Sequence, residues 1–293
     1  MLQEKLSSRF TSQQYSWLVV AGLFLGITIS LVVQTNPSQF FVTDFSQNAS
    51  AENANSPLVQ TKSESGQPSI DLKQRHSYQF PEQFQGRTIN RVTLQPHQKA
   101  IALTFDDGPW PKTTSKVLDI LQEYNVQATF FVLGSNIPQY SDLLQRVALE
   151  GHAIGNHTWS HGYHNHSPAL AQREIQRTAK AIEKYTGVKT SLFRPPGGFL
   201  NNGLVAEAQA QQQVTILWSV DDIYHGTVDE AVQNILQNAT SGGIILMHDG
   251  GGDRELTIKA LPQIITQLRQ QGYQLVTIPQ LLEMSAGQEM KVQ

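Results

Sequence analysis

The stretch at residues 102–109 reads ALTFDDGP, an apolar run that stops at two adjacent carboxylates and a Gly-Pro pair. The run predicts a buried strand, and the Gly-Pro pair predicts a turn directly after it. Neighbouring strand side chains point to opposite faces, so Asp106 and Asp107 share a site only where the strand has ended and the backbone turns. In α/β barrels, such strand ends carry the active site. Alone, however, the pair would also fit an acidic, solvated turn.

Predicted strands and helices alternate about seven times from residue 98 onward. The expected strands are residues 101–105, 128–133, 152–154, 192–193, 214–220, 243–247 and 274–276. The expected helices are residues 113–124, 139–150, 168–185, 204–212, 228–238, 256–270 and 279–284. This alternation predicts a parallel α/β architecture. A closed or partly closed barrel is favoured over an open sheet, because the chain has no Gly-rich dinucleotide fingerprint and no P-loop.

Length and charge limit the domain organisation and the kinds of partner that the chain can have. The chain has 293 residues, which suits one large domain plus extensions, and its formal net charge is −3. Its 21 Lys and Arg residues are not gathered in one block, so we expect no nucleic-acid partner. The chain has no Cys, which leaves both the redox compartment and the oligomeric state open.

The N-terminal part predicts membrane attachment. Residues 17–33 carry no charge over 17 positions, the low end for a spanning helix. Lys5 and Arg9 precede them, so we expect residues 1–16 to stay in the cytoplasm and the rest to be exported. A cleaved signal peptide is the alternative, but the residues just after the apolar core match a cleavage site poorly.

The next segment predicts a flexible linker. Residues 34–95 are rich in Gln, Ser, Asn and Pro and lack an apolar period, so they cannot bury enough surface to offset chain entropy. Short strands near residues 78–80 and 88–94 are compatible with this pattern. We expect this linker to hold a catalytic domain at residues 96–293 outside the membrane.

A histidine pair suggests metal binding. His157 and His161 are four residues apart, so on one helical turn both imidazoles would face the same way. With one carboxylate they would form a site that leaves coordination positions open, as hydrolytic metal sites do. Five His residues crowd residues 152–166, however, and spacing alone does not single out this pair.

Three more segments place polar residues at predicted strand ends. They are Arg194-Pro195-Pro196 after the strand at 192–193, Asp221-Asp222 after 214–220, and His248 after 243–247. Each would be an unremarkable turn by itself. Together with the Asp and His pairs they make a set that chance surface residues have no reason to form.

These motifs resemble the polysaccharide deacetylases of the NodB-homology type, carbohydrate esterase family 4. The matched segments are TFDDGP at 104–109, HTWSH at 157–161, Arg194-Pro195-Pro196, the motif that begins at Asp221, and Leu246-Met247-His248. The resemblance covers residues 99 to 284 and implies a distorted (β/α)7-type barrel. It also implies hydrolysis of acetyl groups from an N-acetylated polysaccharide.

The resemblance implies a metal centre and a base. Asp107, His157 and His161 would hold one divalent ion, zinc in the first place and cobalt or nickel otherwise. Asp106 would be the general base for the attacking water, with Arg194 as its partner.

The same resemblance implies an acid and a substrate pocket. His248 would protonate the departing amine, and Asp221 would orient its imidazole. Leu246 would line a pocket for the acetyl methyl. The backbone N–H of Gly197, which follows Pro196, would face the oxyanion.

The chain departs from the family pattern at two motifs. Gly197 stands where the family often has Tyr, which removes an aromatic wall. Tyr224 and His225 stand where the fourth motif usually has Asp-Trp, so a groove-lining Trp is missing or comes from elsewhere. Trp110 and Trp159 are the candidates, with core or rim packing as the alternative for both and the preferred interpretation for Trp159.

The sequence therefore predicts a membrane-tethered, metal-dependent deacetylase facing the cell wall. Peptidoglycan N-acetylglucosamine is the first substrate expected and a chitin-like glycan the second. The alternatives are an acetyl-xylan type esterase and a catalytically silent glycan-binding protein of the cell envelope.

Overall fold

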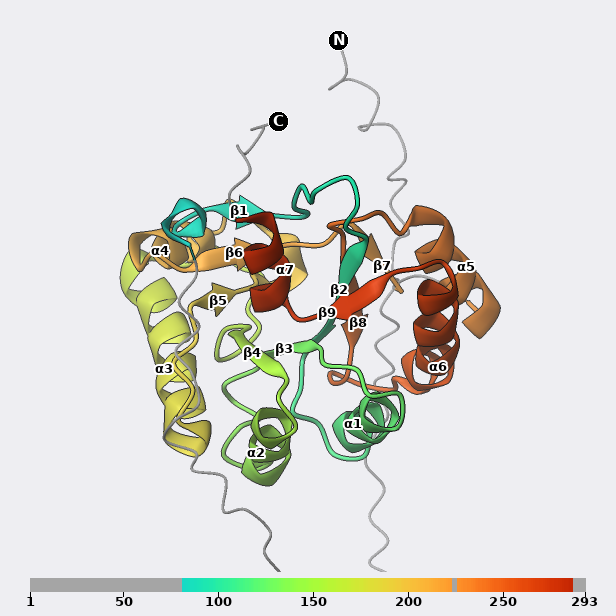
Figure 1. Ribbon diagram of the computed structural model, residues 1–293. Helices are drawn as coiled ribbons and strands as arrows, with labels where there is room; N and C mark the ends of the chain where they lie inside the picture. The colour runs from blue at the N-terminus through green and yellow to red at the C-terminus, as the bar shows by residue number, and fades with distance from the viewer. Residues whose placement is uncertain (1–80, 223–225, 287–293) are drawn as a thin grey trace, which may run out of the picture. The chain divides into compact units, whose positions relative to one another are not determined.

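Nine strands form one parallel sheet in the computed structural model, which describes residues 81–222 and 226–286 (Figure 1). They are β1 (Thr88–Ile89), β2 (Ala100–Asp106), β3 (Thr129–Val132), β4 (Ala153–Asn156), β5 (Leu192–Phe193), β6 (Val214–Ile216), β7 (Val220–Asp221), β8 (Ile244–His248) and β9 (Gln274–Val276). Every strand pairing is parallel, as the alternating pattern predicts.

The sheet is a curled, partly closed barrel. Its order is β1-β6-β5-β4-β3-β2-β8-β7, and β9 pairs with the first half of β2. Within the described residues β1 and β7 do not pair, so strand pairing does not close the ring. Arg91 instead forms an antiparallel bridge to Gly243, and the Val92 N–H donates to the Gly242 carbonyl at 2.9 Å. These contacts connect the β1 end of the sheet to the start of β8.

Helices surround the sheet, and Figure 1 shows α3, α2, α1, α6 and α5 following one another around its outside. The helices are α1 (Thr113–Glu123), α2 (Ser141–Leu149), α3 (Pro168–Thr186), α4 (Leu204–Ala210), α5 (Val228–Asn238), α6 (Glu255–Gln270) and α7 (Ile278–Ser285). Short 3₁₀ turns lie at Glu82–Phe84 and Pro196–Gly198. Both ends of α5 match the prediction, and Thr227 and Glu230 form a capping box that fixes its start.

Strand β2 shows how the fold prepares a site. Its Ile101, Leu103 and Phe105 lie in the cluster that also holds the inner faces of α1, α5 and α6. Ala100 and Ala102 belong to a second cluster with residues of β5, β6, β8 and α7. Because strand side chains alternate, Thr104 and Asp106 point to the same interior side as these alanines. The barrel interior is therefore apolar at the start of β2 and polar at its carboxyl end.

The folded domain begins earlier than predicted. Residues 81–95 were expected to belong to a flexible linker, yet Phe84 is 1 % exposed, and Ile89 and Val92 are also buried. β1 pairs with β6 in register, Thr88 with Thr215. The short strand anticipated near residues 88–94 is present as β1, but the linker prediction is wrong for this segment. A few widely spaced apolar residues pack well here without any periodic pattern.

The predicted strand at 214–220 is also wrong, because the structure splits it. β6 and β7 lie at different places in the sheet, and Leu217–Ser219 connects them. The Ile216 and Leu217 carbonyls accept hydrogen bonds from Arg194 Nε and Nη2, at 3.0 and 3.3 Å. A buried guanidinium thus satisfies backbone groups at the place where the strand ends.

None of the helices within residues 81–222 and 226–286 is long and apolar enough to cross a membrane. The anchor predicted at residues 17–33 and most of the predicted linker lie outside the described residues, as do Tyr224 and His225.

Candidate active site at the carboxyl ends of the strands

The end of β2 brings both aspartates to one side. Asp107 follows the last strand residue with φ of 76°, a left-handed conformation that is uncommon outside glycine. Asn136 Nδ2 donates to the Asp107 carbonyl at 3.0 Å and fixes this turn. The strand therefore ends at Asp106, one residue later than predicted. Strained backbone such as that of Asp107 often marks a functional site.

The two histidines come from a loop and not from the predicted helical turn. Residues 157–161 have no helical assignment, and Thr158 and His161 have φ of 70° and 58°. Asn156 Oδ1 accepts from the Thr158 N–H at 2.9 Å, and Thr158 Oγ1 accepts from the His161 N–H at 3.1 Å. The structure brings the predicted pair together, but through a loop and not through helical spacing.

Asp107, His157 and His161 converge on one point. Asp107 Oδ1 lies 3.6 Å from His157 Nε2 and 3.2 Å from His161 Nε2, and the three ligand atoms are all within 4.8 Å of one another. Ligands about 2.1 Å from a tetrahedral zinc ion stand about 3.4 Å apart, which matches these separations. Asp107 Oδ1 is buried and accepts no hydrogen bond within the described residues. The residues present therefore fit a divalent ion.

His157 is held in the form that a metal requires. Its Nδ1 lies 2.7 Å from the Arg194 carbonyl oxygen, which can only accept, so Nδ1 carries the proton and Nε2 is free to ligate. Burial lowers the pKa of His157 to about 3, although the Asp107 charge acts against it. Asn156 and Thr158 hold the loop, and the imidazole contacts the Arg194 carbonyl instead.

Arg194 and Asp106 form a buried ion pair beside this cluster. Arg194 Nη1 donates to Asp106 Oδ1 at 2.7 Å and to Thr104 Oγ1 at 2.8 Å, and its side chain is 0 % exposed. The guanidinium also packs over the Phe131 ring at 4.0 Å. The other Asp106 oxygen, Oδ2, lies 3.6 Å from His157 Nε2. One oxygen of Asp106 is thus held by Arg194 while the other faces the ligand cluster.

His248 lies beside Asp106 and has Asp222 as its partner. Asp106 of β2 and His248 of β8 are register partners in the sheet. His248 Nδ1 is 3.8 Å from Asp222 Oδ1. Burial alone would lower the pKa of His248, but the facing Asp222 carboxylate and the charges of Asp106 and Asp107 outweigh it, so the pKa is raised. Thr257 Oγ1 donates to Asp222 Oδ2 at 2.6 Å and fixes that carboxylate.

Asp221 is therefore not the partner that the sequence predicted for His248. Its Oδ2 accepts from Trp218 Nε1 at 3.0 Å, and its backbone carbonyl accepts from Asn234 Nδ2 at 2.8 Å. Consecutive residues of an extended segment point to opposite sides, so a displacement of one position exchanges the two carboxylates.

The predicted substrate residues lie around the same end of the sheet. Leu246 is buried in β8, two residues before His248. Pro196 begins a 3₁₀ turn in which Gly197 has φ of 61°. Trp159 does not supply the missing groove wall, because the Arg177 guanidinium covers its ring at 3.5 Å. It is a packing residue.

Two residues near the cluster were missed from sequence. Thr104 lies two positions before Asp106, and strand alternation alone could have placed it beside Arg194. Arg254 Nη2 lies 3.5 Å from Asp107 Oδ2, and its Nε donates to the Gly250 carbonyl. No local pattern marks Arg254, since it approaches Asp107 across the fold.

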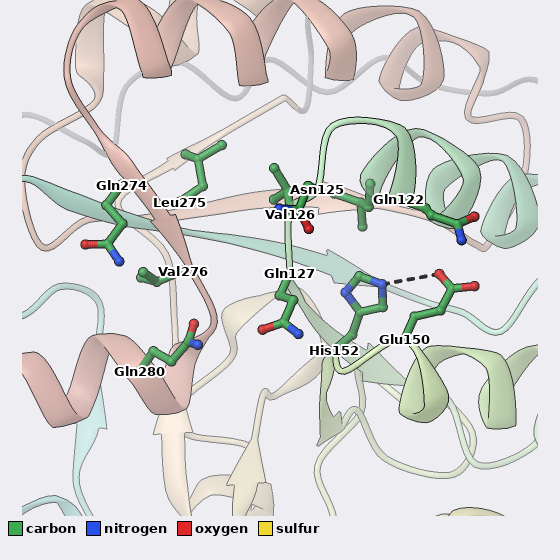
Figure 2. A pocket seen from close by; sticks show the side chains of 11 residues that line it. Gln122, Asn125, Val126, Gln127, Glu150, His152, Gln274, Leu275, Val276 and Gln280 are labelled. Atoms are coloured by element: carbon green, nitrogen blue, oxygen red, sulfur yellow. Dashed lines mark ion pairs between the residues drawn. The ribbon is translucent and has the colours of Figure 1, made fainter. Parts of the chain in front are cut away.

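A separate cavity of about 500 Å³ lies among residues at the opposite strand ends (Figure 2). Val126 and Gln127 come just before β3, His152 comes just before β4, and Gln274 begins β9. The lining side chains are mostly carboxamides and aliphatic groups, together with Glu150 and His152. None of the predicted site residues lines this cavity.

Comparison with known proteins agrees with the geometry at the carboxyl ends. The chain is 41 % identical over 191 residues to the peptidoglycan-N-acetylglucosamine deacetylase of Bacillus cereus, covering 64 % of this chain and 89 % of that protein. The chain belongs to the polysaccharide deacetylase family. The family profile described as polysaccharide deacetylase matches residues 93–216.

Two further proteins are similar to this polysaccharide deacetylase over about two thirds of its length. The peptidoglycan-N-acetylmuramic acid deacetylase PdaC of Bacillus subtilis is 41 % identical over 203 residues, 68 % of this chain and 42 % of PdaC. Among solved structures, the Bc1960 peptidoglycan N-acetylglucosamine deacetylase, in complex with an N-hydroxybenzamide compound, has a TM-score of 0.64 at 33 % identity. The match covers 68 % of this chain and 94 % of the Bc1960 chain. The curled parallel barrel is thus the fold of this family.

Proposed function

We propose that this polysaccharide deacetylase is a divalent-metal-dependent hydrolase that removes acetyl groups from N-acetylated glycans, with peptidoglycan N-acetylglucosamine as its first substrate. The observation that carries the proposal is the convergence of Asp107, His157 and His161 beside two acid–base pairs. Zinc suits the one-carboxylate, two-imidazole set, and cobalt or nickel could replace it. When bound, such an ion polarises a carbonyl and makes water a better nucleophile near neutral pH.

Asp106 is placed to act as the general base. Its Oδ1 is fixed by Arg194, so only Oδ2 is available on the side of the ligand cluster. A water between the cluster and the acetyl carbonyl would give its proton to this oxygen. The fixed orientation matters because a general base must lie within hydrogen-bond reach of the proton that it takes.

His248 is placed to act as the general acid. Its imidazole faces the Asp222 carboxylate, which favours the protonated form, so it can give a proton to the departing nitrogen. Asp222 takes the orienting role that was predicted for Asp221, because its Oδ1 faces His248 Nδ1. An amide needs such an acid more than an ester does, since an amine anion is a very poor leaving group.

The proposal is tested by acetate release from the purified full-length chain. Tetramers of N-acetylglucosamine, peptidoglycan and acetylated xylan should be compared with added Zn²⁺ or Co²⁺ and with a chelator. We expect metal-dependent release from the N-acetylated glycans and little from xylan. Preference for xylan would make the chain an esterase. Binding of glycan without any release at all would favour the silent glycan-binding alternative.

We also propose that the chain is anchored in the cytoplasmic membrane through residues 17–33, with its catalytic domain outside the cell. The support is the uncharged run and the basic residues before it. Membrane fractionation of the full-length chain and of a chain without residues 1–33 tests this. A full-length chain found in the soluble fraction would contradict it, and a mature protein lacking these residues would indicate a cleaved signal peptide.

A further inference from the structure

Three of the four exposed large apolar side chains in the described part of the chain lie on two loops near His161. The four residues are Leu149, Tyr163, Phe199 and Leu200. Leu149 ends α2, whereas Tyr163 and the adjacent pair Phe199 and Leu200 come from two loops near His161. Tyr163 is 57 % exposed and Phe199 is 50 % exposed. Clustered exposed apolar groups usually mark a binding surface.

The rings of this patch continue outward from the ligand cluster. The Tyr163 ring meets the His161 ring edge to face, with centroids 5.0 Å apart and planes at 85°. Phe199 meets Tyr163 in the same manner, at 5.8 Å and 81°. A bound molecule whose reacting group lies at His161 would therefore have its neighbouring part over Tyr163 and Phe199.

Gly197 shows why these two rings lie here. A Cβ atom at this position would stand 2.9 Å from Tyr163 Cε1 and 3.0 Å from Phe199 Cε2, closer than ordinary packing allows. The backbone also has φ of 61°, which side-chain-bearing residues rarely adopt. Tyr163 and Phe199 thus occupy the space that a side chain at 197 would need.

We propose that Tyr163 and Phe199 form an aromatic platform that binds the C–H face of a pyranose ring in the glycan. This inference rests on the proposed function, because it assigns the sugar next to the reacting acetamido group. The face of an equatorially substituted sugar ring is apolar while its rim is hydroxylated, so it suits exposed rings beside a polar site. The patch is a few side chains wide and too small for a stable protein interface.

Binding without turnover provides the first test. We would titrate the full-length chain carrying Asp106→Asn with the N-acetylglucosamine tetramer by calorimetry, alone and combined with Tyr163→Ala. Loss of one stacking ring should weaken binding about tenfold. Tyr163→Phe keeps the ring and should restore the affinity. Leu149→Ala, which removes an exposed apolar side chain elsewhere, is the matched control and should not change it.

Kinetics and a compensating pair give the second test. With Asp106 intact and zinc content verified for each variant, Tyr163→Ala should raise KM more than it lowers kcat. Gly197→Tyr alone should impair binding, because its side chain collides with both rings. Adding Tyr163→Gly to Gly197→Tyr should recover part of the loss, so the two changes should be non-additive.

Two results separate the inference from the function on which it rests. If Tyr163→Ala binds the tetramer as tightly as its parent, the platform is wrong even though acetate release continues. If no glycan loses acetate in the presence of metal, the proposed function fails. The calorimetric comparison still decides the platform in that case, since it requires no turnover.

Discussion

The two ends of the barrel each hold a buried histidine close to a carboxylate, yet they differ in what surrounds it. At the carboxyl ends, His157 is 2 % exposed and lies 3.6 Å from Asp107 Oδ1. At the other end, the side chain of His152 is also 2 % exposed, and Glu150 Oε2 lies 3.7 Å from its Nε2, the pair joined by the dashed line in Figure 2. Burial lowers the pKa of both imidazoles, to about 3 and about 4.

The two ends differ in how many side chains point at one position. At the first end a third group, His161, completes a ligand set, and the backbone carbonyl of Arg194 fixes the tautomer that leaves Nε2 to ligate. At the second end, His152 Nδ1 accepts the Ala128 N–H at 3.1 Å, which ties the residue to the start of β3. A buried imidazole with a lowered pKa is therefore not enough to indicate a site. The neighbouring groups must point at one position.

The largest effect is expected from a variant that removes one ligand of the Asp107, His157 and His161 cluster and leaves the His152 end of the barrel unchanged. His157→Ala should abolish stoichiometric zinc binding and lower acetate release by at least about 10³-fold, because a ligand of the ion that activates the water is lost. His152→Asn keeps an acceptor for the Ala128 N–H and should retain both zinc and activity. Zinc per folded chain and acetate release would be measured for each variant. Equal losses in both variants would contradict the distinction.

A smaller effect should appear in the stability of the second end. The pKa of His152 falls from 6.5 to about 4 on folding, so the folded chain resists a proton that the unfolded chain takes up. The stability that follows from a neutral His152 is present above pH 6.5 and is lost as the pH falls toward 4. It amounts to about 3 kcal/mol.

Urea unfolding of metal-free protein at pH 7 and pH 4 measures this contribution. The loss of stability between the two pH values should be about 3 kcal/mol smaller in His152→Asn than in the parent chain. His97→Asn, at an exposed loop position, is the control and should show the parental loss. An unchanged pH dependence in His152→Asn would contradict the assignment.

The smallest expected effect distinguishes the roles of Asp221 and Asp222, the two neighbouring carboxylates at the end of β7. Asp222→Asn should lower kcat/KM about tenfold, since His248 loses its charged partner. The pKa of His248 should fall, so the alkaline limb of the pH profile should move to lower pH. Asp221→Asn should leave that limb in place. A shift with Asp221→Asn and none with Asp222→Asn would restore the pairing expected from sequence.

Local patterns were enough for much of the fold. The apolar run ending in Asp106 and Asp107 predicted β2 and its turn, and the capping residues Thr227 and Glu230 account for the agreement at α5. Pro168 in the first turn likewise marks the start of α3. In each case the signal lies within a few residues of the feature that it predicts.

The features that sequence missed depend on distant contacts. The segment at 214–220 looks like one strand, but its division into β6 and β7 follows from the curvature of the sheet and from Arg194. The choice of Asp222 over Asp221 depends on which side of an extended segment faces His248 and Thr257. The Tyr163 ring fills the space beside Gly197 from another loop. No pattern along the chain reports such placements.

The contacts of Arg194 have one more consequence. The same guanidinium donates hydrogen bonds to the backbone carbonyls of Ile216 and Leu217 and also orients Asp106. In a molecule whose sheet has not yet brought β5 and β6 to face β2, Arg194 does not orient Asp106 as the general base. Partly assembled chains should therefore be chemically silent, and the onset of turnover during refolding would report the last step of assembly.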